Sequence, residues 1–131
     1  GLLVWQYPNQ FAPYLSALAE LGVHSYLELG VRHGGSFIAT VEILRRAAPI
    51  ARAIAVDVLP CPALDRYTPE GVAFWQVSTL TPRFHEQLNA LGAIDLAMID
   101  THHEAEQCWA EFQRVAPIAR MVALHDIANI G

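Results

Sequence analysis

The feature that most constrains this chain is an alternation, repeated along its length, between short apolar runs and longer segments with helical spacing. Five runs are apolar at nearly every position, which is typical of strands that are buried on both faces of a sheet. Segments with helical spacing between such strands return the chain to the same edge, so the strands lie parallel. The sequence therefore predicts an α/β fold, a three-layer αβα sandwich with a mostly parallel sheet. The expected strands are 25–29, 53–57, 72–77, 94–100 and 121–124.

Capping residues set the expected helix boundaries. Asn9 and Ser36 are side chains of the kind that cap helix starts, and Thr81 stands before a proline, a strong start signal. Gly22 and Gly92 follow two of the amphipathic segments and are expected to end them. The expected helices are 9–21, one from Ser36 that ends before Pro49, 81–91 and 104–115, with a loop at 58–71.

Size and composition narrow the class of protein. The 131 residues match one domain, 1–131, with 1–22 as an N-terminal helical segment, and the 53% of hydrophobic residues suffice for a buried core. A formal net charge of −5 with eight Lys and Arg argues against a nucleic-acid partner. The separate Cys61 and Cys108 indicate reduced thiols of a cytoplasmic protein. We expect no membrane partner, because no apolar stretch approaches the length of a span.

Polar side chains follow every one of the five expected strands. They are Glu28 with Gly30, Asp57, Ser78 with Thr79, Asp100 to His103, and His125 with Asp126. A single acid at a strand end is often only a cap or a solvated group. Agreement at five strand ends is harder to explain that way, because the carboxyl edge of a parallel sheet is where ligands bind. We therefore expect a binding site at this edge.

The glycine-containing loop after the first strand is the sharpest local signal. Gly30 allows a tight turn off the strand, and Gly34 and Gly35 would let the backbone approach a ligand at the amino end of the next helix. A plain strand-to-helix turn also uses glycines. The acid at the end of the second strand, Asp57, favours the ligand interpretation, because a carboxylate there can accept both ribose hydroxyls of a nucleoside.

Three motifs in order resemble a known family. The pattern Glu28-x-Gly30-x-x-x-Gly34-Gly35-Ser36 is similar to the first motif of class I, Rossmann-like S-adenosylmethionine-dependent methyltransferases. Ile94–His103 and Val122–Ile127 are similar to later motifs of the branch with cephalosporin hydroxylase-like proteins and metal-dependent sugar O-methyltransferases. The resemblance covers roughly Tyr26 to Ile127. Such domains continue with two more strands, so we expect either a fragment or a minimal form whose sheet edge a second copy covers, as a homodimer.

The resemblance implies roles for individual residues. The glycine loop would face the methionine part of S-adenosylmethionine, Asp57 would hold the ribose, Ser78 and Thr79 would contact the adenine, and Glu28 would anchor the loop or the ammonium group. The cofactor-binding residues so implied are Glu28, Gly30, Gly34, Gly35, Ser36, Asp57, Ser78, Thr79 and Asp100.

The resemblance also implies a metal and a base. In the metal-dependent members, residues matching Asp100, His125 and Asp126 bind magnesium, and a histidine matching His103 is the general base. Hard oxygen ligands suit Mg²⁺, and a bound cation would lower the pKa of a substrate hydroxyl. Here, however, a histidine replaces one expected acid, and Arg32 replaces the middle glycine of the loop. Three possibilities therefore stay open. The site could bind magnesium, it could bind a softer divalent metal with the help of His102, or it could bind no metal.

The first functional hypothesis is an enzyme, an O-methyltransferase acting on a small polar or sugar-like molecule. The second is a degenerate cofactor-binding module without turnover. The third, a dinucleotide-dependent oxidoreductase using NAD, is weakened because the glycine spacing departs from G-x-G-x-x-G. The aromatic Trp5, Tyr7 and Trp109 either line a pocket or pack against their neighbours.

Overall fold

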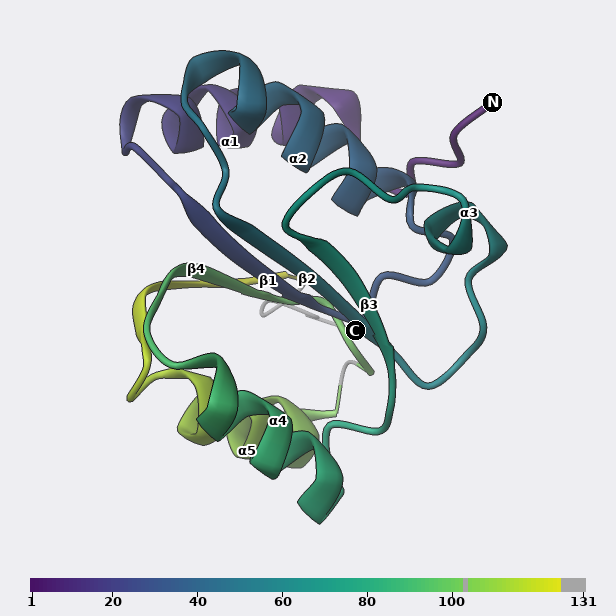
Figure 1. Cartoon of the computed structure of the whole chain (residues 1–131), viewed down its shortest axis with the longest axis vertical. Helices are drawn as coiled ribbons and strands as arrows, with labels where there is room; N and C mark the ends of the chain where they lie inside the picture. The colour runs from purple at the N-terminus through teal and green to yellow at the C-terminus, as the bar shows by residue number, and fades with distance from the viewer. Residues whose placement is uncertain (103, 126–131) are drawn as a thin grey trace.

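The computed structural model describes residues 1–102 and 104–125 and contains one parallel sheet between two layers of helices (Figure 1). The strands are β1 (Ser25–Leu29), β2 (Arg52–Asp57), β3 (Val72–Gln76), β4 (Ile94–Ile99) and β5 (Ala119–Leu124). The helices are α1 (Pro8–Glu20), α2 (Gly35–Ala47), α3 (Pro62–Asp65), α4 (Pro82–Leu91) and α5 (Ala105–Val115).

The strand order is β3-β2-β1-β4-β5, and every neighbouring pair is parallel. The first strand lies at the centre, with Leu27 opposite Ile54 on one side and Ala97 on the other. The chain therefore winds outward from β1 in one direction through β2 and β3, and in the other through β4 and β5. This order confirms the predicted α/β, Rossmann-like architecture and puts a topological switch point beside β1.

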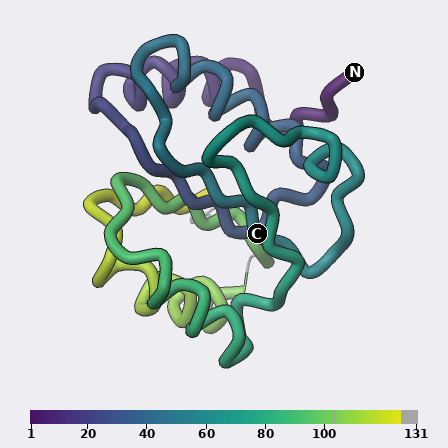
Figure 2. Tube along the Cα trace, viewed as in Figure 1, coloured from purple at the N-terminus to yellow at the C-terminus, as the bar shows by residue number. Residues whose placement is uncertain are grey.

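Alternation along β1 divides the core into two halves. Tyr26 and Glu28 face the layer of α1 and α2, whereas Leu27 and Leu29 face α4 and α5, and all four are buried. Figures 1 and 2 show the two layers on opposite sides of the sheet. The placement of an acid, Glu28, on an otherwise apolar buried face is the feature of the fold that most needs a chemical explanation.

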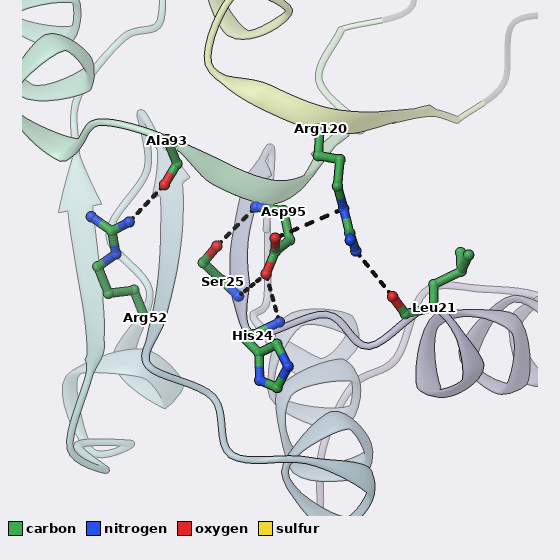
Figure 3. Close-up of polar contacts among 7 residues, drawn as sticks. All are labelled: Leu21, His24, Ser25, Arg52, Ala93, Asp95 and Arg120. Atoms are coloured by element: carbon green, nitrogen blue, oxygen red, sulfur yellow. Dashed lines mark hydrogen bonds and ion pairs between the residues drawn. The ribbon is translucent and has the colours of Figure 1, made fainter.

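A polar cluster ties the amino ends of the central strands together (Figure 3). One carboxylate oxygen of Asp95, at the start of β4, accepts the backbone N–H of His24 at 2.8 Å and of Ser25 at 3.1 Å. The hydroxyl of Ser25 accepts the N–H of Asp95 in return, at 2.8 Å. Arg120 of β5 pairs with Asp95 at 3.8 Å and donates to the carbonyl of Leu21. This amino-edge cluster fixes the register of three strands.

Two predicted helix caps were wrong. α1 begins at Pro8 after Tyr7, so proline, which lacks an N–H and has a helical φ, opens it in place of an Asn9 cap. α2 begins at Gly35, one residue before the position expected, because the left-handed φ of Gly34 ends the loop there. The hydroxyl of Ser36 is then free to bind Glu28 rather than the helix end.

Smaller differences concern lengths. β5 begins two residues earlier than expected, at Ala119, and the predicted loop 58–71 contains the short helix α3. Thr81 caps α4 as predicted, accepting the N–H of Phe84 at 3.4 Å. Of the residues described, none belongs to a helix long and apolar enough to cross a bilayer.

Candidate functional site

The carboxyl ends of the strands form one continuous edge, because the hydrogen bonds of the sheet extend one residue past β1, β3, β4 and β5. Gly30 donates to the carbonyl of Val56 and Asp100 donates to that of Leu29, each at 2.8 Å. On the two flanks, Val77 donates to the carbonyl of Asp57 and His125 to that of Ile99. The order across the edge is therefore Val77, Asp57, Gly30, Asp100 and His125, which brings together polar residues predicted from all five strand ends.

The loop after β1 is left-handed at three positions. The φ angles are 85° at Gly30, 49° at Arg32 and 76° at Gly34. A Cβ at Gly30 would lie 2.2 Å from the carbonyl oxygen of Asp100, and one at Gly35 would lie 2.1 Å from that of Leu3. The sequence suggested that Gly34 and Gly35 admit a ligand. In the structure, a Cβ at Gly34 would lie 2.9 Å from Sγ of Cys61, so packing inside the protein also requires glycine there, and the contact with a ligand stays a prediction.

Asp57 lies beside this loop, as predicted. Its Oδ2 accepts the N–H of Arg32 at 2.7 Å, and its Oδ1 accepts the N–H of Leu59 at 2.9 Å. The carboxylate is half-buried and oriented by two backbone donors. Since each carboxylate oxygen can accept more than one hydrogen bond, both oxygens retain capacity for two neighbouring hydroxyls.

Glu28 is the chemically unusual acid of the edge. Its carboxylate is 2% exposed and accepts the hydroxyl of Tyr26 at 2.6 Å and that of Ser36 at 3.3 Å. Burial has the largest effect on the pKa of Glu28 and raises it, and the charge of Asp100 raises it further. The hydrogen bonds from Tyr26 and Ser36 lower it, and the resulting pKa is about 7. The bond to Ser36 links β1 to the first turn of α2.

Asp100 is contacted from both sides of the edge. Its Oδ1 lies 3.1 Å from Nδ1 of His125, and its Oδ2 accepts the side-chain N–H of Gln6 at 2.9 Å. The predicted residues His103 and Asp126 lie outside the described residues. Within 1–102 and 104–125, no three His, Cys, Asp or Glu side chains cluster closely enough to hold a metal ion. His102 is exposed, and α5 begins at Ala105 after Glu104.

The ends of β3 and β4 are joined by a buried acid that the sequence interpretation missed. Glu111 of α5 is 0% exposed and accepts the hydroxyls of Thr79 and Thr101, each at 2.5 Å. Gln107 donates to the same carboxylate at 3.0 Å. The hydroxyl of Thr79 is therefore used inside the protein, while Ser78 is half-buried and its Oγ accepts the N–H of Leu80. We call this group the Glu111 cluster.

A pocket opens at the edge on the α1 and α2 side and has a volume of about 180 Å³. Its lining comes from the N-terminal segment and α1, from α2, and from the ends of the three strands β1, β4 and β5. The lining residues are Gln6, Gln10, Phe11, Tyr14, Tyr26, Glu28, Ser36, Thr40, Met98, Ala123, Leu124 and His125.

The N-terminal segment crosses the glycine loop on its way to this pocket. The ring of Trp5 stacks on His33 with centroids 5.9 Å apart, and the guanidinium of Arg32 lies 4.0 Å from the centre of the Trp5 ring. Gln6 then reaches Asp100. Trp5 thus packs against the loop rather than lining the pocket described above, and Tyr7 and Trp109 are exposed.

Comparisons with known proteins identify the family and the fold. A family model described as a methyltransferase domain matches residues 27–127. Rhamnosyl O-methyltransferases of Mycobacterium bovis and Mycobacterium tuberculosis are 29% identical, over 90% of this chain and 50% of theirs. The chain thus spans about half the length of these curated relatives. An O-methyltransferase from Bacillus cereus, solved in complex with SAH, superposes with a TM-score of 0.65 at 17% identity, over 88% of this chain and 53% of that one.

Proposed function

The chain belongs to the methyltransferase-domain family, and we propose that it binds S-adenosylmethionine at the carboxyl edge and transfers its methyl group to a hydroxyl of a sugar-like molecule. The observation that carries the proposal is the position of Asp57 beside the left-handed loop at Gly30 and Arg32. The names of the relatives, rhamnosyl O-methyltransferases, support the class of acceptor.

The residues at the edge fit a nucleoside with a sulfonium side chain. Asp57 is held by two backbone donors and keeps lone pairs for the two ribose hydroxyls. The adenine would lie toward Ser78, on the side of the edge where the Glu111 cluster fixes the loops after β3 and β4. The methionine end would lie toward Gly34, Gly35 and Ser36, at the positively polarised amino end of α2.

When bound, S-adenosylmethionine supplies an electrophilic methyl group on a positively charged sulfur. The chain's own residues would bind and orient the acceptor hydroxyl and remove its proton. Asp100, with His125 on one oxygen and Gln6 on the other, stands where that hydroxyl would approach. We assign the general base to His103, because a neutral imidazole accepts a proton near neutral pH.

A divalent cation is the second part of the proposal. Asp100 and His125 are close enough to share a cation, and Asp126, which lies outside the described residues, would be the third ligand. A carboxylate and an imidazole together suit a transition metal at least as well as Mg²⁺. Dialysis against a chelator followed by addition of Mg²⁺, Mn²⁺ or Zn²⁺ would then restore methyl transfer, and the order of effectiveness would identify the preferred ion.

The decisive experiment is calorimetric titration of the protein with S-adenosylmethionine and with S-adenosylhomocysteine, with NAD as the comparison ligand. We expect both sulfur nucleosides to bind and NAD not to bind. Replacing Asp57→Asn should weaken binding about 10- to 100-fold, because an amide keeps the shape but loses a charged acceptor for the ribose. The control is Asp65→Asn, an exposed acid in α3.

Three results would contradict parts of the proposal. Binding of NAD in preference to the sulfur nucleosides would favour an oxidoreductase. Binding without methyl transfer to any sugar would favour a non-catalytic module. An unchanged affinity in Asp57→Asn would remove the ribose assignment.

Two further parts of the proposal concern the protein in the cell. Both cysteines, Cys61 and Cys108, are free thiols, which supports a reducing, cytoplasmic compartment. A homodimer that covers a sheet edge would protect the unpaired backbone groups of an edge strand. Size-exclusion chromatography with light scattering would measure its mass.

A further inference from the structure

The pocket lies on the opposite side of β1 from Asp57. Its strand residues come from β1, β4 and β5, and neither Asp57 nor any residue of β2 or β3 lines it. A nucleoside whose ribose is held at Asp57 would therefore reach this pocket only with its methionine end, at Ser36, and would leave the side formed by Gln6, Gln10 and Phe11 free. Since the edge runs from Asp57 through Gly30 to Asp100, a methyl group carried beyond the ribose would point toward the pocket.

The surface of the pocket is mostly apolar and aromatic, with a few polar side chains and no Lys or Arg among the lining residues. The mouth presents the amides of Gln6 and Gln10, each of which donates and accepts hydrogen bonds. Tyr14 and Tyr26 also line the pocket, and the Tyr26 hydroxyl donates to Glu28 at 2.6 Å. Burial first, and then the nearby Glu28, raises the pKa of both tyrosines, so they stay protonated. Phe11 adds an aromatic surface. Paired donors and acceptors with an aromatic surface suit an uncharged polyhydroxyl group better than an anion.

We propose that this pocket is the acceptor subsite and holds one uncharged sugar ring, with Gln6 and Gln10 as the residues that recognise it. The inference rests on the proposed methyltransferase function and adds to it the place and the chemistry of the acceptor. The volume of about 180 Å³ is below the roughly 300–1,000 Å³ of sites for drug-sized ligands. One ring, or the terminal ring of a longer glycan, is the matching size.

Gln6 has a particular part in this subsite. Its amide N–H donates to Asp100 at 2.9 Å, and the hydrogen bond joins residues 94 positions apart in the sequence. An incoming hydroxyl can take the place of the amide N–H as donor to Asp100, and the rotated amide can then bind a neighbouring hydroxyl of the same ring. Gln6 is thus a positioning residue that exchanges one hydrogen bond for two when the sugar enters.

Amide spectroscopy tests the proposal directly. In ¹H–¹⁵N spectra of the protein saturated with S-adenosylhomocysteine, adding L-rhamnose up to 100 mM should shift the side-chain amide signals of Gln6 and Gln10. The signal of Gln113, exposed on α5, should not move. D-Glucuronate, an anionic sugar of similar size, should cause smaller shifts, because Glu28 and Asp100 repel it.

Variants separate recognition from folding. Gln6→Ala and Gln10→Ala should each raise the KM for L-rhamnose about fivefold to tenfold while leaving the affinity for S-adenosylhomocysteine within twofold, and Gln113→Ala should change neither. Thermal unfolding of each variant checks that the fold is intact.

The possible outcomes separate the test of the acceptor subsite from the test of the proposed methyltransferase function. S-Adenosylhomocysteine binding without shifts at Gln6 and Gln10 would overturn the subsite and leave the methyltransferase proposal standing. Rhamnose shifts without nucleoside binding would support the sugar subsite and overturn the methyltransferase. A glucuronate response larger than that of rhamnose would overturn the assignment to an uncharged ring.

Discussion

The two ends of the central strands hold acids in opposite electrostatic states. At the amino edge, burial acts to raise the pKa of Asp95, but the N–H groups of His24 and Ser25 and the charge of Arg120 outweigh it, and the pKa is lowered. At the carboxyl edge, burial prevails at Glu28, whose pKa is raised to about 7. Fixed backbone donors surround the first acid, whereas hydroxyls and another acid surround the second.

The difference separates an acid that holds strands together from one whose protonation is available for chemistry. Asp95 accepts hydrogen bonds from backbone N–H groups and pairs with Arg120, so its role is to hold the strands together. Among the residues that the structure describes, Glu28 accepts hydrogen bonds from two side-chain hydroxyls, and it lies against a pocket. Perturbed acids next to pockets are typical of functional sites. Three substitutions test this comparison, and we describe them from the largest expected effect to the smallest.

The largest effect is expected at Glu111, a carboxyl-edge acid with a structural role. Glu111→Ala removes the acceptor shared by Thr79, Thr101 and Gln107 inside the protein. We expect the free energy of unfolding to fall by about 3 kcal/mol, because buried donors lose their partner. Urea denaturation measures the change. The control Glu106→Ala, exposed on the same helix, should stay within about 0.5 kcal/mol of the wild type. An equal loss in both variants would show that the cluster adds no stability.

The second effect is a pH dependence at Glu28. Between pH 4.5, the ordinary value, and about 7, the folded protein retains a proton that the unfolded chain has released. The stability that Glu28 contributes is therefore full below pH 4.5 and is lost as the pH rises to 7. The total change in the free energy of unfolding over this range is roughly 3 kcal/mol. Glu28→Gln should flatten this part of the stability profile. Asp95 should behave with the opposite sign, because its lowered pKa makes its contribution disappear as the pH falls.

Denaturation curves at half-unit pH intervals would measure the two slopes. A wild-type profile whose stability rises between pH 4.5 and 7, with the same rise in Glu28→Gln, would contradict the assignment of the raised pKa to Glu28.

The smallest effect is expected for Asp95→Ala. Its side chain is 26% exposed, so water replaces part of what is lost, and we expect the free energy of unfolding to fall by about 1–2 kcal/mol. The affinity for S-adenosylmethionine should stay within twofold of the wild type, measured by calorimetry. The affinity could instead fall by more than the loss of folded protein explains. That result would contradict the division into a structural amino edge and a functional carboxyl edge.

The sequence predicts the sheet and its carboxyl edge because both follow from local patterns. Runs that are apolar at nearly every position identify the strands, and parallel pairing brings the residues after Leu29, Val56 and Ile99 to one edge. Cap positions were less predictable, since Pro8 and Gly34 compete with Asn9 and Ser36 for the same helix starts.

The partners within the edge could not be predicted to the same extent. Glu111 did leave a signal: it falls with Cys108, Phe112 and Val115 at helical spacing, on the face of α5 that is otherwise apolar. The contact of Gln6 with Asp100 left none, because its two residues are 94 positions apart and a glutamine near a chain end is ordinary. Long-range contacts of this kind depend on packing that no local pattern encodes.

The seam between Gly30 and Asp100 has a consequence for how specificity in such a domain can change. Because the peptide group of Asp100 fills the space where a side chain at position 30 would be, a substitution at Gly30 would displace the backbone at Asp100. If the chain binds a nucleoside and a sugar as proposed, a change of acceptor has little room at these two strands. The N-terminal segment offers more room, because Trp5 contacts Arg32 and His33, and Gln6 contacts Asp100, through their side chains. Under the proposed function, new acceptor preferences would arise in that segment first, while the strands that would hold the nucleoside stay unchanged.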